Sequence, residues 1–426
     1  MKNIFRSVSG WAAAIALAAV PAYVAGQQAL TWDQVKSRFE AVNPTLKADA
    51  LSVDETRAQE ITADLRPNPT VGLLMDGTSI APSNGTWVPF RGTYEQPSIN
   101  YLHERRNKRE LRLQTAQEGT HIAESQHEDL KRTLEFALHT AFVNTLQAKA
   151  ILELSRSDLE QYDHIIQIGR DRFRAGDIAQ IDLDRIELLR VQYETEIQTA
   201  IVNLRTAKIQ LQQLLDDRTP VERFDVAGPF DFSESLRPLD DFRQIALDGR
   251  PDLRAALQAI QQSETNHKLA IANGSTDPTF GAWYTYNSSN NNPNGIQTLG
   301  ASVNIPLRVF DHNQGEKQRT LIDIDKSKQA SEAMRAQVFS DVDSAYATVE
   351  SNIALLKPYK AKYRDQATRV RDTVTYSYQH GGASLIDMLS AQSDYRQVQL
   401  AYLQLIGAYL NAAGQLNLAV GREVLP

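Results

Sequence analysis

Cysteine is absent from all 426 residues of the chain. The protein can therefore form no disulfide, and it carries no lipid-modified N-terminal cysteine. Enzyme signatures are missing as well, since there is no cysteine nucleophile, no Gly-x-Ser-x-Gly elbow, no phosphate-binding glycine loop and no His-Glu-x-x-His. The eight histidines are scattered, and no two are spaced four residues apart. We expect no catalytic site, no cofactor site and no metal site.

Long hydrophobic runs are also missing. Residues 1–26 look like a secretory signal peptide, with a basic start at Lys2 and Arg6 and an apolar core from Trp11 to Val20 that is too short to span a bilayer. No later segment has the run of about 18 apolar residues that a membrane helix needs. We expect the mature chain to be exported. It is then either soluble in the periplasm or crosses a membrane by strands, whose sequence signal is weaker.

Positive charge is in short supply. The formal net charge is −7, and cleavage after residue 26 removes Lys2 and Arg6 and leaves −9. A nucleic-acid partner would favour a basic patch, so we expect none.

The mature sequence is internally duplicated. Four short motifs occur twice, in the same order and 204 to 209 residues apart; one of them is Pro69 to Gly72 (PTVG), which matches Pro278 to Gly281 (PTFG). Repetition at a fixed offset is typical of a chain built from repeated structural units. The chain therefore divides into two structural repeats, residues 27–217 and 239–426, joined by a linker of residues 218–238.

Each repeat is predicted to contain long helices. From about His103 to Phe173 there is no proline, and a helix of about 70 residues would be roughly 100 Å long. A heptad seam in the second repeat has one polar position, Asn352, and otherwise consists of Val338, Val342, Ala345, Val349 and Leu356. Helices of this length indicate a coiled coil or a helical tube.

Each repeat also contains a predicted strand pair. The pair at about 279–307 has a second strand in which apolar and polar residues alternate from Thr298 to Leu307, and a polar turn at 288–295. The first repeat carries a looser version at about 70–101. Two interpretations remain open. The strands either cross an outer membrane or form soluble hairpins whose apolar face packs on the chain's own helices.

Four strands are too few to close a barrel. In lipid, every open edge leaves backbone groups unsatisfied at several kcal/mol each. If the strands cross a membrane, strands from several copies must therefore close one barrel. Since known barrels start at about eight strands, either a dimer or a trimer is geometrically possible.

A predicted chain reversal occurs in each repeat, near 174–185 and near 379–390. Gly176 and Gly381 supply the permissive backbone that a helix–turn–helix tip needs. Asp182 and Asp387 follow the turns, where the helix dipole stabilises an acidic residue by roughly 0.3–1 kcal/mol.

Taken together, these motifs resemble the TolC-like outer-membrane efflux channels over nearly the whole mature chain. The two reversals are the most specific features. The stretches Ile305 to Leu307, Phe310 to Glu316 (FDHNQGE) and Lys108 to Arg112 (KRELR) are most similar to the branch that contains the CzcC-type heavy-metal efflux components.

The resemblance implies a mainly α fold with a small β part. Long antiparallel helical hairpins would form an α-barrel in the periplasm, and four membrane strands per chain would form a β-barrel shared by a homotrimer in the cell outer membrane. The linker 218–238 would lie in an equatorial band around the tube. The implied partners are outer-membrane lipid, a periplasmic adaptor (a membrane fusion protein) and an inner-membrane pump of the RND type. The channel would export heavy-metal cations or drugs passively.

The resemblance also implies roles for residues at the tips. Asp387 matches a family aspartate that rings the closed entrance, where three copies would repel one another and attract cations. Tyr378 and Asp182 match residues whose hydrogen bond between neighbouring tips holds the entrance shut. Ser390 stands where a second acidic ring would be, and Ala383 where an arginine link would be. We therefore expect a less negative and less tightly latched entrance.

The tips around Gly176 and Gly381 are expected to contact the adaptor. Two other functions remain open. A periplasmic coiled-coil adaptor would also be exported, but it should have one helical hairpin flanked by glycine-rich β halves. An outer-membrane channel for type I protein secretion would share the fold and the gate and differ only in its partner.

Overall fold

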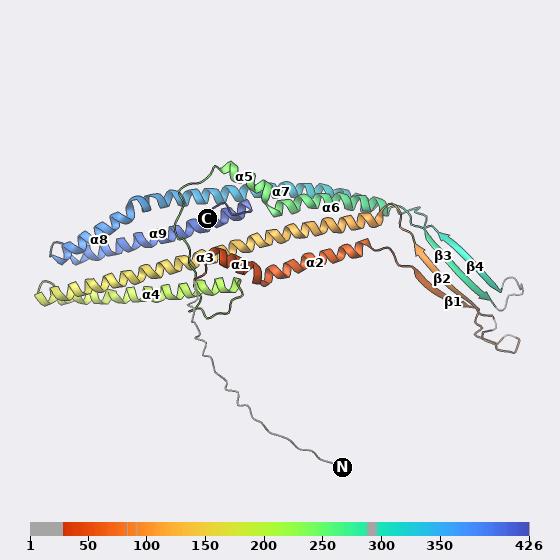
Figure 1. Ribbon diagram of the computed structural model, residues 1–426, viewed down its shortest axis with the longest axis horizontal. Coiled ribbons are helices and arrows are strands. Elements are labelled where there is room, and N and C mark those ends of the chain that lie inside the picture. Colours follow the sequence, from red (N-terminus) through yellow and green to blue (C-terminus); the bar gives the residue numbers. More distant parts are fainter. Residues whose placement is uncertain (1–28, 83, 91, 288–295, 426) are drawn as a thin grey trace, which may run out of the picture.

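The molecule is elongated, with a sheet at one end, two helical tips at the other and a helical body between them (Figure 1). The computed structural model describes residues 29–82, 84–90, 92–287 and 296–425. The predicted signal peptide and the predicted turn at 288–295 lie outside the described residues.

Both halves follow the same order of two helices, two strands and a long helical hairpin. The first half consists of α1 (Trp32–Val42), α2 (Pro44–Asp64), β1 (Thr70–Asp76), β2 (Tyr94–Leu102), α3 (Lys108–Ala175) and α4 (Gln180–Leu214). The second half consists of α5 (Leu239–Gly249), α6 (Pro251–Asn273), β3 (Thr279–Asn287), β4 (Gln297–Asn304), α7 (Gln314–Pro358), the π-helix η2 (Tyr359–Tyr363), α8 (Arg364–Gln379) and α9 (Leu385–Val420). The predicted fold class, mainly α with a small antiparallel β part, is confirmed.

The two strand pairs combine into one antiparallel sheet in the order β1-β2-β3-β4. The central pairing of β2 with β3, for example Ile99 opposite Ala282, joins the two repeats. The outer strands β1 and β4 have a free edge within the part of the chain that the structure describes. This sheet is therefore an open fragment that another strand can extend on either side.

One face of the sheet is apolar and uncovered. Val71 on β1 and Leu299 on β4 are 81% and 85% exposed, and Ile99, Phe280 and Val303 on the same face are also exposed. The sheet extends beyond the ends of the helices (Figure 1). The interpretation as soluble hairpins packed on their own helices is therefore wrong. A contiguous apolar face left in water would be unfavourable, at about 25 cal/mol per Å².

The opposite face of the sheet is mostly polar and closely packed across the strands. A Cβ atom at Gly300 on β4 would lie 2.4 Å from the ring of Trp283 on β3, and one at Gly281 would lie 2.6 Å from Asn100 Oδ1. Glycine at these positions allows the large and polar side chains of neighbouring strands to lie flat on the sheet.

The core of α7 departs from the predicted heptad. Val338, Val342, Ala345, Val349 and Leu356 are buried as expected, but Ile353 takes the remaining core position. Asn352 instead donates a hydrogen bond from Nδ2 to the Thr348 carbonyl at 2.8 Å, away from the core. The assignment of Asn352 to the seam is therefore wrong. Asn352 and Ile353 are neighbours on opposite flanks of the stripe that Val349 and Leu356 define, and the apolar side chain is the one that packs into the core.

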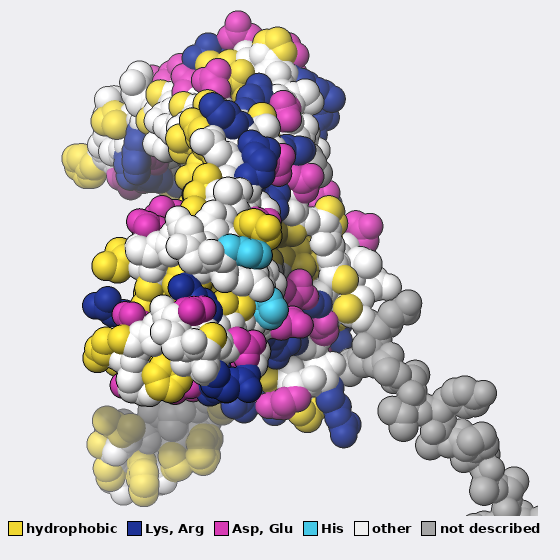
Figure 2. All heavy atoms as spheres, turned by 90° about the vertical axis from the view of Figure 1, so that its left-hand side faces the viewer, with side chains coloured by type: hydrophobic (Ala, Val, Ile, Leu, Met, Phe, Trp, Pro, Cys, Tyr) yellow, Lys and Arg dark blue, Asp and Glu magenta, His cyan; other side chains and the backbone are white. Residues whose placement is uncertain are grey.

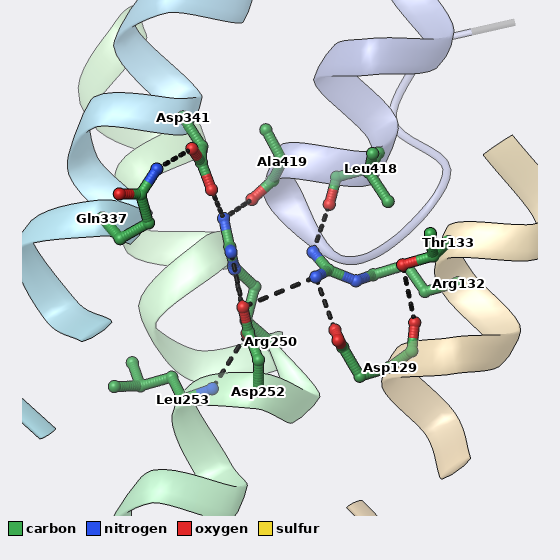
Figure 3. Close-up of polar contacts among 10 residues, drawn as sticks. All are labelled: Asp129, Arg132, Thr133, Arg250, Asp252, Leu253, Gln337, Asp341, Leu418 and Ala419. Atoms are coloured by element: carbon green, nitrogen blue, oxygen red, sulfur yellow. Dashed lines mark hydrogen bonds and ion pairs between the residues drawn. The ribbon is translucent and has the colours of Figure 1, made fainter. Parts of the chain in front are cut away.

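A polar cluster fastens four helices near the middle of the molecule (Figure 3). Arg250, at the start of α6, donates through Nη1 to Asp341 Oδ2 on α7 at 2.8 Å and to the Ala419 carbonyl on α9 at 3.1 Å. Asp252 lies between Arg250 and Arg132 of α3, whose Nη2 is 3.5 Å from Asp252 Oδ2. Because these charges are largely buried, removing one partner would leave another uncompensated.

The first repeat has an uncharged hydrogen bond at the corresponding position. Asn43 occupies the position that matches Arg250 and donates through Nδ2 to the Leu214 carbonyl at the end of α4, at 2.9 Å. In both repeats, the start of the second helix is thus bound to the end of the last helix.

The segment between α4 and α5 has little regular structure and wraps the body at the same level. Phe224 and Val226 are buried against α1 and α3, and Phe232 is buried in the core around α7 and α9. A parallel bridge joins Leu30 to Val226. The anchored aromatic side chains fix this segment to both repeats.

Candidate functional site at the helical tips

The first tip joins α3 to α4 through a left-handed glycine. Gly176 has φ +80° and donates its backbone N–H to the Phe173 carbonyl at 3.0 Å, and Asp177 donates to the Arg172 carbonyl at 2.9 Å. A side chain at Gly176 would be strained by this φ, although the space around it is open. This glycine ends α3 and reverses the chain direction.

The second tip joins α8 to α9 in a similar way. Gly381 has φ +77°, and Gly382 donates its N–H to the Ser377 carbonyl at 2.7 Å. Ser384 is the N-cap of α9. The two reversals therefore lie side by side at the same end of the molecule (Figure 1).

Asp387 closes a capping box at the start of α9. Its Oδ2 accepts from the Ser384 hydroxyl at 2.7 Å and from the Ser384 N–H at 3.2 Å, while its own N–H donates to Ser384 Oγ. The side-chain hydrogen bond, followed by the backbone one, lowers the pKa of the fully exposed Asp387 carboxyl. The residue is therefore an ionised, outward-facing carboxylate with a fixed orientation.

Tyr378 is packed between the two hairpins. It is 2% exposed and lies in a cluster with Tyr162 and Ile186 of the first hairpin. The Arg172 guanidinium lies 4.6 Å from the centre of its ring, and Arg172 Nη1 donates to the Tyr378 carbonyl at 2.8 Å. Burial raises the pKa of Tyr378, and the positive charge of Arg172 opposes that rise. Arg172 thus joins one tip to the other.

The expected bond between Tyr378 and Asp182 is not formed within the described part of the chain. The Tyr378 hydroxyl is buried and has no hydrogen-bond partner there. Asp182, in the first turn of α4, is close enough for its negative charge to contribute to the raised pKa of Tyr378. The bond between neighbouring tips therefore stays a prediction. Ser390, one turn after Asp387 on α9, is exposed.

Further polar contacts hold the hairpins together above the tips. Arg371 of α8 donates to Gln161 Oε1 of α3 at 2.6 Å, and Arg396 of α9 donates to Glu196 of α4 at 2.9 Å. Asp158 is buried nearby, and burial raises its pKa to about 6. The contact between the hairpins thus contains a carboxyl group that ionises near neutral pH.

Viewed from the tip end, the surface carries charges of both signs (Figure 2). Acidic and basic side chains alternate with exposed hydrophobic ones. Ile181 and Ile386, which occupy matching positions in the two tips, are both largely exposed. Such a mixed surface suits a reversible protein contact.

Two kinds of site are not found in the described ranges. Among those residues, no group of three or more histidines, aspartates or glutamates could hold a metal ion. Of the helices described, none is long and apolar enough to cross a membrane.

Sequence reasoning missed two residues at the tips. The capping partner Ser384 had a usable signal, since serine three residues before an acidic residue is a capping-box pattern. Arg172 had none, because its role depends on a neighbour 206 residues away. The resemblance implied an arginine link at the position of Ala383, which has no such side chain. Arg172 of the first hairpin makes an arginine contact between the tips instead.

Known proteins with similar sequences are found for this chain. The model of the outer membrane efflux protein family matches residues 242–422. The cobalt-zinc-cadmium resistance protein CzcC of Cupriavidus metallidurans is 23% identical over 402 residues, which are 92% of this chain and 90% of that protein.

Solved structures show the same fold. The channel CusC has a TM-score of 0.78 at 18% identity, covering 92% of both chains. The CmeC outer membrane channel of Campylobacter jejuni has a TM-score of 0.74 at 15% identity, covering 93% of this chain and 87% of that one. The fold matched in this way consists of two long helical hairpins attached to an open, apolar-faced sheet. The family model thus matches the second half of the chain, and the fold of the described chain is that of these solved channels.

Proposed function

We propose that this outer-membrane protein is the channel component of a tripartite efflux system, a passive conduit from the periplasm to the exterior. The observation that carries the proposal is the four-stranded sheet, which has one exposed apolar face and free edges at β1 and β4. Only strands from other copies can satisfy these edges in lipid. A homotrimer would close such a sheet into a barrel, with the polar face lining the lumen.

The export substrate is inferred from relatives. CzcC is named for resistance to cobalt, zinc and cadmium, which supports heavy-metal cations, with drugs as the second class. A conduit of this kind needs no catalytic residue and no tightly held metal, because conduction requires weak binding. The fold, with two helical hairpins in tandem, does not match the adaptor alternative. A channel for type I protein secretion would differ only in its partner.

We assign the periplasmic gate to Asp182, Tyr378, Asp387 and Ser390. Three copies of Asp387, each held outward by its capping box, would form a ring that attracts cations and repels anions. Tyr378 and Asp182 would hold the tips together in the closed state. The tips around Gly176 and Gly381 would receive a periplasmic adaptor, which connects the channel to an inner-membrane pump of the RND type.

Single-channel conductance of the mature protein in a planar bilayer tests this function. We expect the wild type to give a small, cation-preferring conductance, because three carboxylates would face a narrow entrance. Asp387→Asn should weaken the cation preference, since it removes one negative charge per subunit. Tyr378→Phe should enlarge the conductance by loosening the latch.

Asp177→Asn is the matched control for charge, because Asp177 is another exposed acidic residue at a tip. It should leave ion selectivity unchanged. Channels that respond equally to Asp177→Asn and Asp387→Asn would refute the filter assignment. Correctly assembled protein that forms no channels would refute the function itself.

A further inference from the structure

A cavity of about 420 Å³ lies where the sheet joins the helical body. Its walls come from the connection between α2 and β1 and from the turn between β2 and α3. They include Arg66, Tyr101, Arg105, Arg106, Asn107 and Arg109. Four arginines around one cavity are a concentration of positive charge in a chain whose net charge is −7.

Glu104 and Glu110 also line the cavity, but Glu104 is paired with Arg112 and Glu110 lies against Arg109, so three of the arginines have no paired counter-charge in the described ranges. Within the described residues, the exposed side chains of Arg66, Arg105 and Arg106 form no hydrogen bond or ion pair. Neighbouring basic groups are satisfied, as in Lys108, whose Nζ lies 2.6 Å from Asp277 Oδ2. Asp277 also accepts the Arg105 backbone N–H at 2.9 Å, which fixes the turn and leaves the Arg105 side chain outside.

Arg109 adds a buried donor without an acceptor. Its Nε is buried and has no hydrogen-bond partner among the described residues. The Arg109 guanidinium forms two long ion pairs, from Nε to Asp64 Oδ1 at 3.7 Å and from Nη2 to Glu110 Oε1 at 3.5 Å, and neither satisfies the buried Nε–H. A buried guanidinium N–H left unpaired is costly, so an anion in the cavity would relieve that cost.

The turn has an unusual backbone that presents the arginines. Arg106 and Asn107 are consecutive non-glycine residues with φ +62° and +54°. Such backbone strain persists where the surrounding structure imposes it, often at binding sites. In the second repeat Asn313 has the same conformation, with φ +63°, but Asp311 and His312 precede it. The basic character is therefore specific to the first repeat.

The cavity lies at the edge of the apolar face of the sheet. Tyr101, which lines it, is opposite Phe280 on that face. Arg105 follows the end of β2 by three residues, which extend at most about 10 Å. The headgroup layer on each side of a bilayer is about 5–8 Å thick. If the apolar face contacts lipid, the guanidinium groups reach the phosphates of the leaflet that faces the periplasm.

We propose that the cavity formed by Arg66, Arg105, Arg106 and Arg109 binds the phosphate of an anionic phospholipid in the periplasmic leaflet of the outer membrane. The inference rests on the proposed function, because it needs the sheet to lie in the membrane. Guanidinium groups bind phosphate through paired N–H donors. The lipid would fix the height of the channel in the membrane at one point in every subunit.

Native mass spectrometry of the detergent-purified channel tests the proposal. The probe is an equimolar mixture of dioleoylphosphatidylglycerol and dioleoylphosphatidylcholine. The wild type should retain phosphatidylglycerol preferentially. Arg105→Gln together with Arg106→Gln should lower this retention by about fivefold or more for each arginine removed. Arg66→Gln, on the other wall of the cavity, should lower it by itself and serves as a second variant if the double variant assembles poorly.

Arg335→Gln is the matched control, because Arg335 is exposed on α7 and is likewise without an ion pair in the described ranges. It should retain lipid as the wild type does. Equal retention by the double variant and the wild type would overturn the proposal. Complete displacement of the lipid by millimolar inorganic phosphate would show a free-phosphate site and would also overturn it. Conductance of the double variant, expected to equal that of the wild type, separates this test from that of the channel.

Discussion

At the scale of single residues, Arg172 is the clearest link between the two tips. It stacks on the ring of Tyr378 and donates to the carbonyl of the same residue. A hydrogen bond from a charged donor contributes about 1.5–3 kcal/mol and an exposed cation–π contact about 0.5–1 kcal/mol. The link thus stabilises the contact between the tips by a few kcal/mol, as the proposed gate requires.

We predict that Arg172→Gln favours the open state. The change removes the charge over Tyr378, and the second hairpin should separate from the first more often. Single-channel recording should then show longer or larger openings than in the wild type. Arg174→Gln is the control, since the partner of Arg174 among the described residues is the exposed Asp171 on its own helix. Openings unchanged by Arg172→Gln would mean that the hydrophobic cluster and the polar contacts of Arg371 and Arg396 hold the tips without Arg172.

Asp158 makes the contact between the hairpins sensitive to pH. Burial raises its pKa from 3.8 to about 6; Arg396 and Arg371 oppose that rise, and Glu196 adds to it. The folded state therefore holds the proton more tightly than the unfolded state. This stabilisation is fully present below about pH 4 and is lost as the pH rises through about 6.

We predict that the wild type is more resistant to thermal unfolding at pH 5 than at pH 7. Asp158→Asn removes the ionisation and should raise stability at pH 7 by up to about 2–3 kcal/mol, an order-of-magnitude value from the pKa shift. Melting curves of both proteins at the two pH values check this. A pH dependence that persists unchanged in Asp158→Asn would assign it to another group.

At the scale of helices and strands, most of the fold followed from the sequence. The period of two in β4 and the long stretches without proline identified strands and helices from local pattern alone. The burial of Ile353 shows what the local pattern could not predict. Asn352 and Ile353 both flank the buried stripe of α7 between Val349 and Leu356, and only the packing partners decide which of them is buried. The contacts of Arg172 with Tyr378 could not be predicted for a related reason, because they join helices from different repeats.

The corrected register of α7 gives a direct test. Ile353→Ala should lower the free energy of unfolding by about 2–5 kcal/mol, because it leaves a cavity in a packed core. Asn352→Ala, one position earlier, should change it by no more than about 0.5 kcal/mol. Thermal unfolding of the two variants side by side measures the difference. A larger loss in Asn352→Ala would restore the heptad assignment.

At the scale of the whole molecule, the free edges of β1 and β4 require assembly. The absence of cysteine makes the assembly simple to probe, because any thiol introduced is the only one. We predict that a chain carrying both Thr70→Cys in β1 and Asn304→Cys in β4 gives covalent trimers with a flexible bis-maleimide. Each single variant should remain mostly monomeric on a denaturing gel. Absence of cross-linked species from the double variant in membranes would contradict a barrel shared between subunits.

The π-helix η2 has a mechanical consequence. The first tip is connected to the membrane sheet by α3, one unbroken helix of 68 residues, whereas the path to the second tip is interrupted at η2. A π-turn is a local weak point at which helices bend. A force on the first tip is therefore transmitted to the membrane along one rigid helix. A force on the second tip is taken up by bending at η2. In this duplicated chain the first hairpin is therefore rigid along its length, whereas the second can bend at η2.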